Sequence, residues 1–190
     1  MNAKQIILLF IFWTFILNIP NNVPGHEISN IYPPYFIQHD MQNHKKINTI
    51  TKYITQNYNV NPVVAKKISK SLIIEAENFN IKPGILLSII ESESSFNHLA
   101  ISKNGCRGLM QINLPVWEDE LNINKDNILN ISTNIYCGTK ILQSYMEQTN
   151  NINKALFLYS GKDKKYNSKI AANIDKYLIF KRKYCRRPYS

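Results

Sequence analysis

The chain has 190 residues and a formal net charge of +10, from 23 Lys and Arg against 13 Asp and Glu. Hydrophobic residues make up 44% and aromatic residues 11% of it, enough to build a core, which argues against a disordered chain. Only 6 Gly and 8 Pro are present, which argues against a collagen-like or low-complexity protein. The length predicts a single domain with short extensions.

Several common functional motifs are missing from the sequence. There is no CxxC, HExxH, GxxxxGK[ST] or GxGxxG pattern, so zinc chemistry and the usual nucleotide sites have no support. We therefore predict no metal and no cofactor. The positive charge favours polyanionic partners, namely nucleic acid, an acidic membrane face or an anionic wall polymer. Because no clustered base-reading motif accompanies the charge, a nucleic-acid partner is the least supported.

The N-terminus carries a compartment signal. Residues 6–19 form an almost unbroken apolar run after Lys4, and Pro20 ends it. A run of about 14 residues has the length of the apolar region of a signal peptide and is short for a membrane span. We predict a signal peptide over residues 1–24 and export to the periplasm. The alternative is an uncleaved N-terminal anchor in the inner membrane.

The next segments predict an irregular region followed by a helix. Residues 25–46, rich in Pro and His, predict an irregular arm or linker. The pattern turns helical from about residue 48. Asn61 followed by Pro62 predicts a helix start, with Asn as the cap and Pro at the first helical position, and Asn80 closes that helix.

Pro83 begins a helix, to about residue 94, that carries an unusual carboxylate. On a helical wheel Glu93 falls on the apolar face with Leu86, Ile89 and Ile90, whereas Glu91 falls on a serine-rich face predicted to be solvated. Desolvation would raise the pKa of Glu93 and suit it to act as a general acid. The alternative places Glu93 at the helix end, in water or paired with a base such as Arg107.

The remaining elements complete a mainly helical domain over residues 47–180. Asn104-Gly105 predicts a small β-hairpin near residues 100–112. Pro115 starts a short helix, and Ser132 is the predicted cap of a longer one. Helical spacing continues over residues 152–159 and 165–179, and a basic tail over residues 181–190 follows.

The cysteines leave two possibilities open. Export would place Cys106, Cys137 and Cys185 in an oxidising compartment. A Cys106–Cys137 bridge would close a loop of about thirty residues and contribute about 3–4 kcal/mol in the chain-entropy model. The other possibility is that these residues are buried free thiols.

Three blocks of sequence form one ordered pattern. The first block is Glu93-Ser94-Ser95-Phe96-Asn97, then Ala100, Ser102, Gly105 and Gly108-Leu109-Met110-Gln111. The second is Asn134-Ile135, then Gly138 and Ile141-Leu142, and the third is Ala155-Leu156, then Tyr159-Ser160-Gly161. In order and spacing these blocks resemble the bacterial lytic transglycosylases with a soluble-lytic-transglycosylase domain. The resemblance spans roughly residues 70–178 and implies a mainly α, lysozyme-like fold of the goose-type or transglycosylase kind. Size and export signal resemble the small members that accompany secretion and conjugation machines.

The resemblance also implies an activity. The family cleaves the β-1,4 bond between N-acetylmuramic acid and N-acetylglucosamine without water, because the muramic O6 hydroxyl attacks its own C1 and leaves a 1,6-anhydro end. It assigns Glu93 as the single catalytic acid and base, since an intramolecular nucleophile removes the need for a second carboxylate. The implied substrate-binding residues are Ser102, Met110, Gln111, Asn134 and Tyr159. The implied partners are peptidoglycan glycan strands and secretion or conjugation proteins.

This sequence departs from the family pattern at His98, Cys106 and Ser160, where the family usually has proline, a small residue and asparagine. Two other functions stay open. A hydrolytic muramidase would share Glu93 but need a water held by a second carboxylate; Asp119 and Asp126 are present. A noncatalytic wall-binding component of a secretion assembly would keep the fold alone.

Overall fold

The computed structural model describes the backbone of residues 34–185 and the side chains of residues 38–184. The predicted signal peptide lies outside the described residues. The chain divides into two compact units between Gln42 and Asn43, and the apolar core belongs to the second. The elements are α3 (Pro34–Tyr58), α4 (Pro62–Asn78), α5 (Pro83–Ser94), β1 (Cys106–Arg107), β2 (Ile112–Asn113), α6 (Leu114–Leu121), α7 (Ile131–Thr149), α8 (Ile152–Tyr159) and α9 (Tyr166–Cys185).

The first and last described helices extend beyond the segments predicted for them. Residues 34–46 were expected to be irregular but form the first turns of α3, because Pro34 occupies the first helical position, where a proline is tolerated. These turns are mostly polar, so no apolar periodicity marks them. At the other end, α9 continues through Cys185, so the first half of the predicted basic tail is helical.

Local capping explains where the helices begin. The Asn61 side chain accepts a hydrogen bond from the Val63 amide at 2.9 Å and Pro62 follows it, which confirms the predicted start of α4. The predicted cap of α7 is wrong. Asn130 caps that helix by accepting from the amides of Ser132 and Thr133, whereas the Ser132 hydroxyl is within 3.0 Å of the Ser71 hydroxyl.

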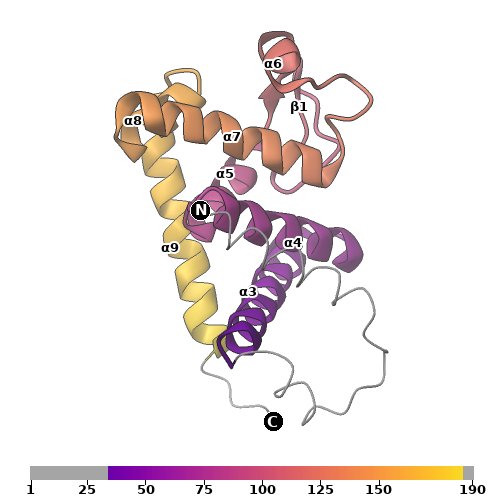
Figure 1. The fold of residues 1–190 in the computed structure, drawn as a ribbon, viewed down its shortest axis with the longest axis vertical. Helices are drawn as coiled ribbons and strands as arrows, with labels where there is room; N and C mark the ends of the chain where they lie inside the picture. The colour runs from indigo at the N-terminus through magenta and orange to yellow at the C-terminus, as the bar shows by residue number, and fades with distance from the viewer. Residues whose placement is uncertain (1–33, 186–190) are drawn as a thin grey trace, which may run out of the picture. The chain divides into compact units, whose positions relative to one another are not determined.

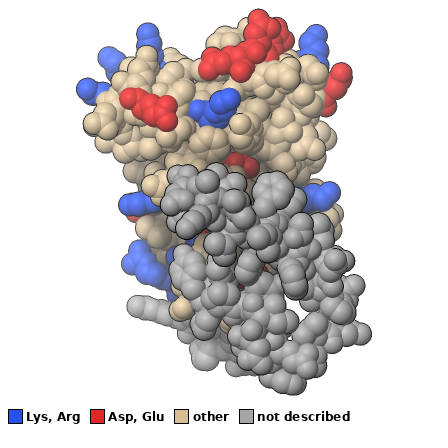
Figure 2. All heavy atoms as spheres, viewed as in Figure 1, with Lys and Arg blue, Asp and Glu red and all other residues tan. Residues whose placement is uncertain are grey.

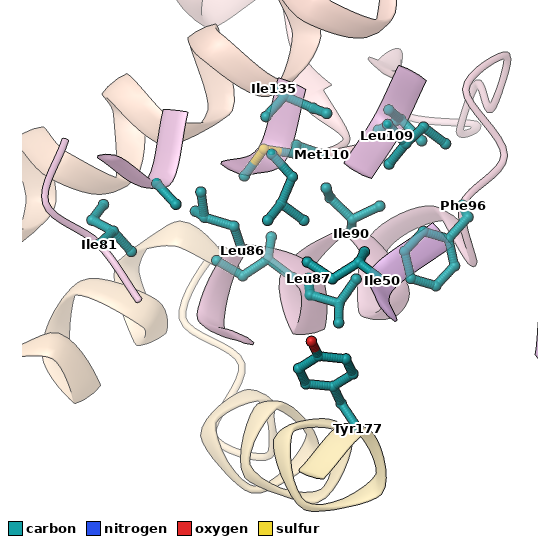
Figure 3. Close-up of a cluster of buried hydrophobic side chains, with 14 of the residues drawn as sticks. Ile50, Ile81, Leu86, Leu87, Ile90, Phe96, Leu109, Met110, Ile135 and Tyr177 are labelled. Atoms are coloured by element: carbon teal, nitrogen blue, oxygen red, sulfur yellow. The ribbon is translucent and has the colours of Figure 1, made fainter. Parts of the chain in front are cut away.

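The core is centred on α5. Leu86, Leu87, Ile89 and Ile90 are all 0% exposed and contribute to a cluster with α3, α4, α7 and α9. Figure 3 shows Leu86, Leu87 and Ile90 between Ile135 of α7 and Tyr177 of α9. Burial of each such aliphatic side chain is worth about 1.5–3 kcal/mol before the entropy cost of ordering the chain. The helix that carries Glu93 is therefore held in the middle of the domain.

The predicted β-hairpin is present and short. Strands β1 and β2 pair antiparallel, with Arg107 opposite Ile112, and residues 108–111 form the loop. Asn104-Gly105 lies one turn earlier, where Gly105 has φ +82° and its amide donates to the Ser102 carbonyl at 3.1 Å. A smaller apolar cluster joins the hairpin and α6 to α7; its buried members are Ile112, Leu114, Ile123, Ile128, Cys137 and Ile141.

Two glycines allow the hairpin loop to approach α7 closely. A Cβ on Gly138 of α7 would lie 2.6 Å from the Met110 sulfur, and a Cβ on Gly108 would overlap the Asn134 side chain. Gly108 also has φ +75°, which favours glycine. At each of these two points the backbone of a glycine packs against a side chain of the other element, and these contacts fix the hairpin on α7. The predicted mainly helical domain with one small hairpin is thereby confirmed (Figure 1). Within residues 34–185, no helix is both long and apolar enough to cross a membrane.

Candidate active site

A cleft of about 530 Å³ lies beside the C-terminal turn of α5. Its walls come from α5, the hairpin and the turn before it, α6, α7, the end of α8 and the start of α9. Of the predicted site residues, Glu93, Ser102, Gln111 and Tyr159 line the cleft. Met110 and Asn134 are not among its lining residues.

Glu93 is partly buried in this cleft and contacts one tyrosine. The hydroxyl of Tyr166, at the first position of α9, donates to Glu93 Oε1 at 2.6 Å. Burial raises the pKa of Glu93 above its usual value, although the Tyr166 hydrogen bond and the positive charge of Lys169 act in the opposite direction. Glu93 therefore holds a proton to higher pH than an exposed glutamate, as a general acid must.

Tyr166 contacts the Glu93 carboxyl, and the sequence did not predict this contact. Helical spacing placed residue 166 only within the last predicted helix, residues 165–179. Burial, and next the charge of Glu93, raises the pKa of the Tyr166 hydroxyl far above its usual value, so it remains a protonated donor. Tyr166 lies 73 positions after Glu93, so no local pattern in the sequence indicates the contact.

Tyr159, one of the predicted substrate-binding residues, is hydrogen-bonded to the hairpin loop. It lines the cleft, but its hydroxyl donates to the Met110 carbonyl at 2.9 Å. Burial raises the pKa of Tyr159 well above its usual value, so this donor also stays protonated. Its described hydrogen bond fixes the hairpin loop rather than Glu93.

Glu91 was expected in solvent and is instead 8% exposed. Tyr53 of α3 donates to Glu91 Oε2 at 2.8 Å, and the Lys176 ammonium of α9 donates to Oε1 at 3.2 Å. The same ammonium donates to the Tyr58 hydroxyl at 2.6 Å. The wheel prediction is wrong because α3 and α9 cover the serine-rich face of α5, so both sides of this helix are packed.

Helix α9 contacts α5 through a row of polar side chains at helical spacing. Tyr166 binds Glu93, Lys169 Nζ donates to the Ser92 carbonyl at 2.9 Å, and Asn173 Nδ2 donates to the Ser88 carbonyl at 3.3 Å. Lys176 continues the row to Glu91. Figure 1 shows α9 running down from α8 past α5. Because these contacts recur along successive turns, α9 sets the position of the helix that carries Glu93.

Ser102 and Gln111 line the cleft while also shaping its wall. Ser102 Oγ accepts from the Cys106 amide at 3.0 Å and closes the turn before β1. Gln111 has φ +47°, and its Nε2 donates to the carbonyls of Gly108 and Ala100 at 3.0 and 3.3 Å. Their predicted substrate contacts stay predictions. In the structure Ser102 stabilises the turn before β1, and Gln111 stabilises the hairpin loop.

Asn134 and Met110 support the cleft from behind. Asn134 is 1% exposed, and its Oδ1 accepts from the Met110 amide at 2.8 Å. Its Nδ2 donates to the carbonyls of Arg107 and Ile128 at 3.0 and 2.9 Å. Met110 is fully buried against Gly138. The sequence therefore located two residues that position the loop, although it predicted substrate contact for them.

Cys106 and Cys137 are both free thiols in the structure, with no bridge between them, and of the two only Cys137 is buried as the alternative expected. Cys106 is partly exposed at the cleft wall. Cys137 is buried in the smaller apolar cluster, where it packs as a small apolar residue, and burial raises the pKa of its thiol.

Among the described residues that line the cleft, two carry carboxylates, Glu93 and Asp163. Asp163 lies between α8 and α9, where its Oδ1 accepts from the Lys165 amide at 2.9 Å and its carbonyl accepts from the Tyr166 amide. It therefore serves the start of α9. Asp119 and Asp126, the acids noted from the sequence, are exposed and do not line the cleft. Within residues 38–184 no group of three or more His, Cys, Asp or Glu is placed to hold a metal ion.

A mainly helical domain whose cleft holds a desolvated glutamate at a helix end fits the lysozyme-like class that the resemblance implies. The family comparison agrees with this class. The chain belongs to the transglycosylase SLT domain family, whose model matches residues 70–177. The predicted resemblance and the predicted lysozyme-like fold are thereby confirmed.

One curated relative supports the same assignment. A protein named "Transglycosylase" from Enterobacteria phage PRD1 is 29% identical over 106 residues. The alignment covers 51% of this chain and 39% of that protein, so the chain matches well under half the length of that relative.

Proposed function

We propose that this protein is a peptidoglycan lytic transglycosylase. It would cleave the β-1,4 bond between N-acetylmuramic acid and N-acetylglucosamine and leave 1,6-anhydro-muramic ends. The observation that carries the proposal is Glu93, a desolvated carboxyl in an open cleft, held at 2.6 Å by a tyrosine that stays protonated. Family membership supports the same substrate class.

Glu93 would serve as acid and then as base. The protonated carboxyl gives its proton to the glycosidic oxygen as the bond from C1 to that oxygen breaks. The resulting carboxylate then takes the proton of the muramic O6 hydroxyl as O6 bonds to C1, so no proton and no water are consumed overall. The Tyr166 hydroxyl, aimed at Oε1, would stabilise the carboxylate formed between the two steps.

A hydrolytic muramidase is the competing reaction at the same cleft. It requires a second carboxylate to position a water. Asp163 is the described candidate because it lines the cleft. Its Oδ1 already accepts a backbone hydrogen bond at the start of α9, which favours a capping role over water activation.

The charge distribution supports an anionic, extended substrate. Figure 2 shows Lys and Arg spread apart over the described part of this face, with an acidic group at the top over α6, which carries Glu118, Asp119 and Glu120. Dispersed cations would raise encounters with the carboxylates of peptidoglycan stem peptides. Binding to isolated sacculi should therefore weaken as salt rises, and binding that is independent of salt would contradict this part of the proposal.

The compartment is proposed from the sequence. The apolar run at residues 6–19 supports export, and peptidoglycan lies outside the inner membrane. The resemblance to small transglycosylases of secretion and conjugation machines supports local wall remodelling at such a machine.

Product chemistry tests the proposed reaction. Purified sacculi would be digested with the wild-type chain, Glu93→Gln, Asp163→Asn and Glu147→Gln, and the muropeptides read by mass spectrometry. Glu147 is the matched control because it is exposed on α7 and does not line the cleft. We expect the wild-type chain, Asp163→Asn and Glu147→Gln to release products with 1,6-anhydro ends. In Glu93→Gln the rate of product release should fall about 10²–10⁴-fold.

Two outcomes would contradict the proposal. Reducing ends that disappear in Asp163→Asn would show a hydrolase with Asp163 as its second carboxylate. Sacculi that bind the wild-type chain and stay uncut would favour the noncatalytic wall-binding component.

A further inference from the structure

Lys169 stands out because it is the one cation among the described residues that line the cleft. It lies on α9 one turn after Tyr166, and its ammonium donates to the Ser92 carbonyl at 2.9 Å. Ser92 directly precedes Glu93, and α5 ends at Ser94. The ammonium therefore sits at the negative end of the catalytic helix, where a cation is favoured.

The other titratable groups around Glu93 carry no positive charge. Tyr166 and Tyr159 have raised pKa values and stay neutral. The remaining titratable side chains of the cleft lining are Cys106 from β1, Tyr145 from α7 and Asp163 from the segment between α8 and α9. Among the described side chains that line the cleft, Lys169 is thus the source of formal positive charge near the Glu93 carboxyl.

Resting on the function proposed above, we infer that Lys169 is a positioning residue that holds the last turn of α5 and favours the carboxylate form of Glu93 for the second half of the reaction. Burial alone favours the protonated acid, which suits departure of the leaving group but hinders removal of the O6 proton. The attraction of Lys169 for the carboxylate lowers the pKa of Glu93 against the effect of burial. One side chain then balances the two roles that Glu93 must fill.

The hydrogen bond and the charge can be separated by substitution. Lys169→Gln keeps a donor for the Ser92 carbonyl and removes the charge, and Lys169→Arg keeps both. Lys164→Met is the matched control, since it removes an exposed lysine just before α9 that does not line the cleft. Thermal unfolding of each full chain confirms that it is folded before comparison.

The first readout does not depend on activity. Carbon-13 NMR follows the titration of Glu93 directly in chains labelled at the Glu carboxyl. The Glu93 resonance is assigned as the one missing from the spectrum of Glu93→Gln. We expect the midpoint to move to higher pH in Lys169→Gln and to stay at the wild-type value in Lys169→Arg and Lys164→Met. An unchanged midpoint in Lys169→Gln would overturn the inference. In the wild-type chain, high ionic strength should move the midpoint upward, because salt screens an exposed cation.

The second readout is the pH dependence of sacculus digestion. The alkaline limb of the kcat/KM profile should move to higher pH in Lys169→Gln. The rate lost in this variant should appear in kcat, with KM unchanged. A raised KM with an unmoved Glu93 titration would make Lys169 a substrate contact and overturn the inference. If no variant and no wild-type chain cuts sacculi, the proposed function fails, while the NMR titration still decides whether Lys169 acts on Glu93.

Discussion

Two glutamates of α5 lie two residues apart and have opposite surroundings. Glu91 faces α3 and α9, with a tyrosine hydroxyl and an ammonium bound directly to its two oxygens. Glu93 faces the cleft and accepts from the Tyr166 hydroxyl, while the nearby Lys169 ammonium is bound to a backbone carbonyl. Burial raises the pKa of Glu93.

The difference shows what turns a buried carboxylate into a catalyst. A carboxylate in direct contact with a cation keeps its charge and serves to hold helices together. A desolvated carboxylate whose nearest cation is bound elsewhere can exchange a proton with a substrate. On this helix the two carboxylates differ in how a lysine meets them. The Lys176 ammonium binds an oxygen of Glu91 directly, whereas the Lys169 ammonium near Glu93 binds the Ser92 carbonyl.

Removing the charge at Glu91 should produce the largest change in stability. Glu91→Gln leaves the Lys176 ammonium and the buried Tyr53 hydroxyl with a weaker acceptor, and should lower the free energy of unfolding by about 1–3 kcal/mol. Urea unfolding measures this. Glu147→Gln, at an exposed site on α7, should change it by less than about 0.5 kcal/mol.

Activity supplies the contrast for the same variant. Below its unfolding temperature Glu91→Gln should digest sacculi at close to the wild-type rate. A loss of activity as large as that of Glu93→Gln in a folded chain would show that Glu91 takes part in the chemistry, and the division of roles would be wrong.

Tyr166→Phe should produce an intermediate effect at the catalytic end. The hydrogen bond from Tyr166 to Glu93 Oε1 lowers the pKa of that carboxyl, so its removal should raise the pKa. The alkaline limb of the pH–rate profile should therefore move to higher pH. Loss of one hydrogen bond to a charged group, about 1.5 kcal/mol, should reduce the maximal rate about tenfold. Tyr159→Phe is the contrasting variant, since its hydroxyl binds the Met110 carbonyl; an equal pH shift there would contradict the assignment.

The smallest expected effect is a pH-dependent gain in stability in Glu93→Gln. The folded pKa of Glu93 is raised, so its contribution to stability is fully present below the unfolded pKa and is lost as pH rises through the folded value. Above that window Glu93→Gln should melt at a higher temperature than the wild-type chain, and the difference should fade toward acid pH. Calorimetry at several pH values tests this, and a difference that grows toward acid pH would contradict it.

The sequence predicted what is encoded locally. The Asn61-Pro62 start of α4 and the Pro83 start of α5 each depend on side chains within a few residues of the helix end. Glu93 was found because it shares a helix face with Ile89 and Ile90 and begins a recognisable block. The β-hairpin was found from its glycines, although Asn104-Gly105 marks the turn before it.

What the sequence did not reveal depends on contacts between distant segments. Glu91 was misplaced because its partners lie 38 and 85 residues away, at Tyr53 and Lys176. The tyrosine that binds Glu93 was missed for the same reason. A helical wheel describes one helix, and it misassigns any face that two other helices cover.

Helix α3 precedes the family-matched segment, residues 70–177, yet part of it belongs to the same folded body. Tyr53 is fully buried, its ring lies edge-on to Tyr177 and Phe180 of α9, and its hydroxyl binds Glu91. A fragment cut at the borders of the family match would lose Tyr53 and leave the buried Glu91 Oε2 without its tyrosine donor. The folded unit around α5 therefore extends beyond the family match, and any graft of this cleft onto another protein should carry the second half of α3 with it.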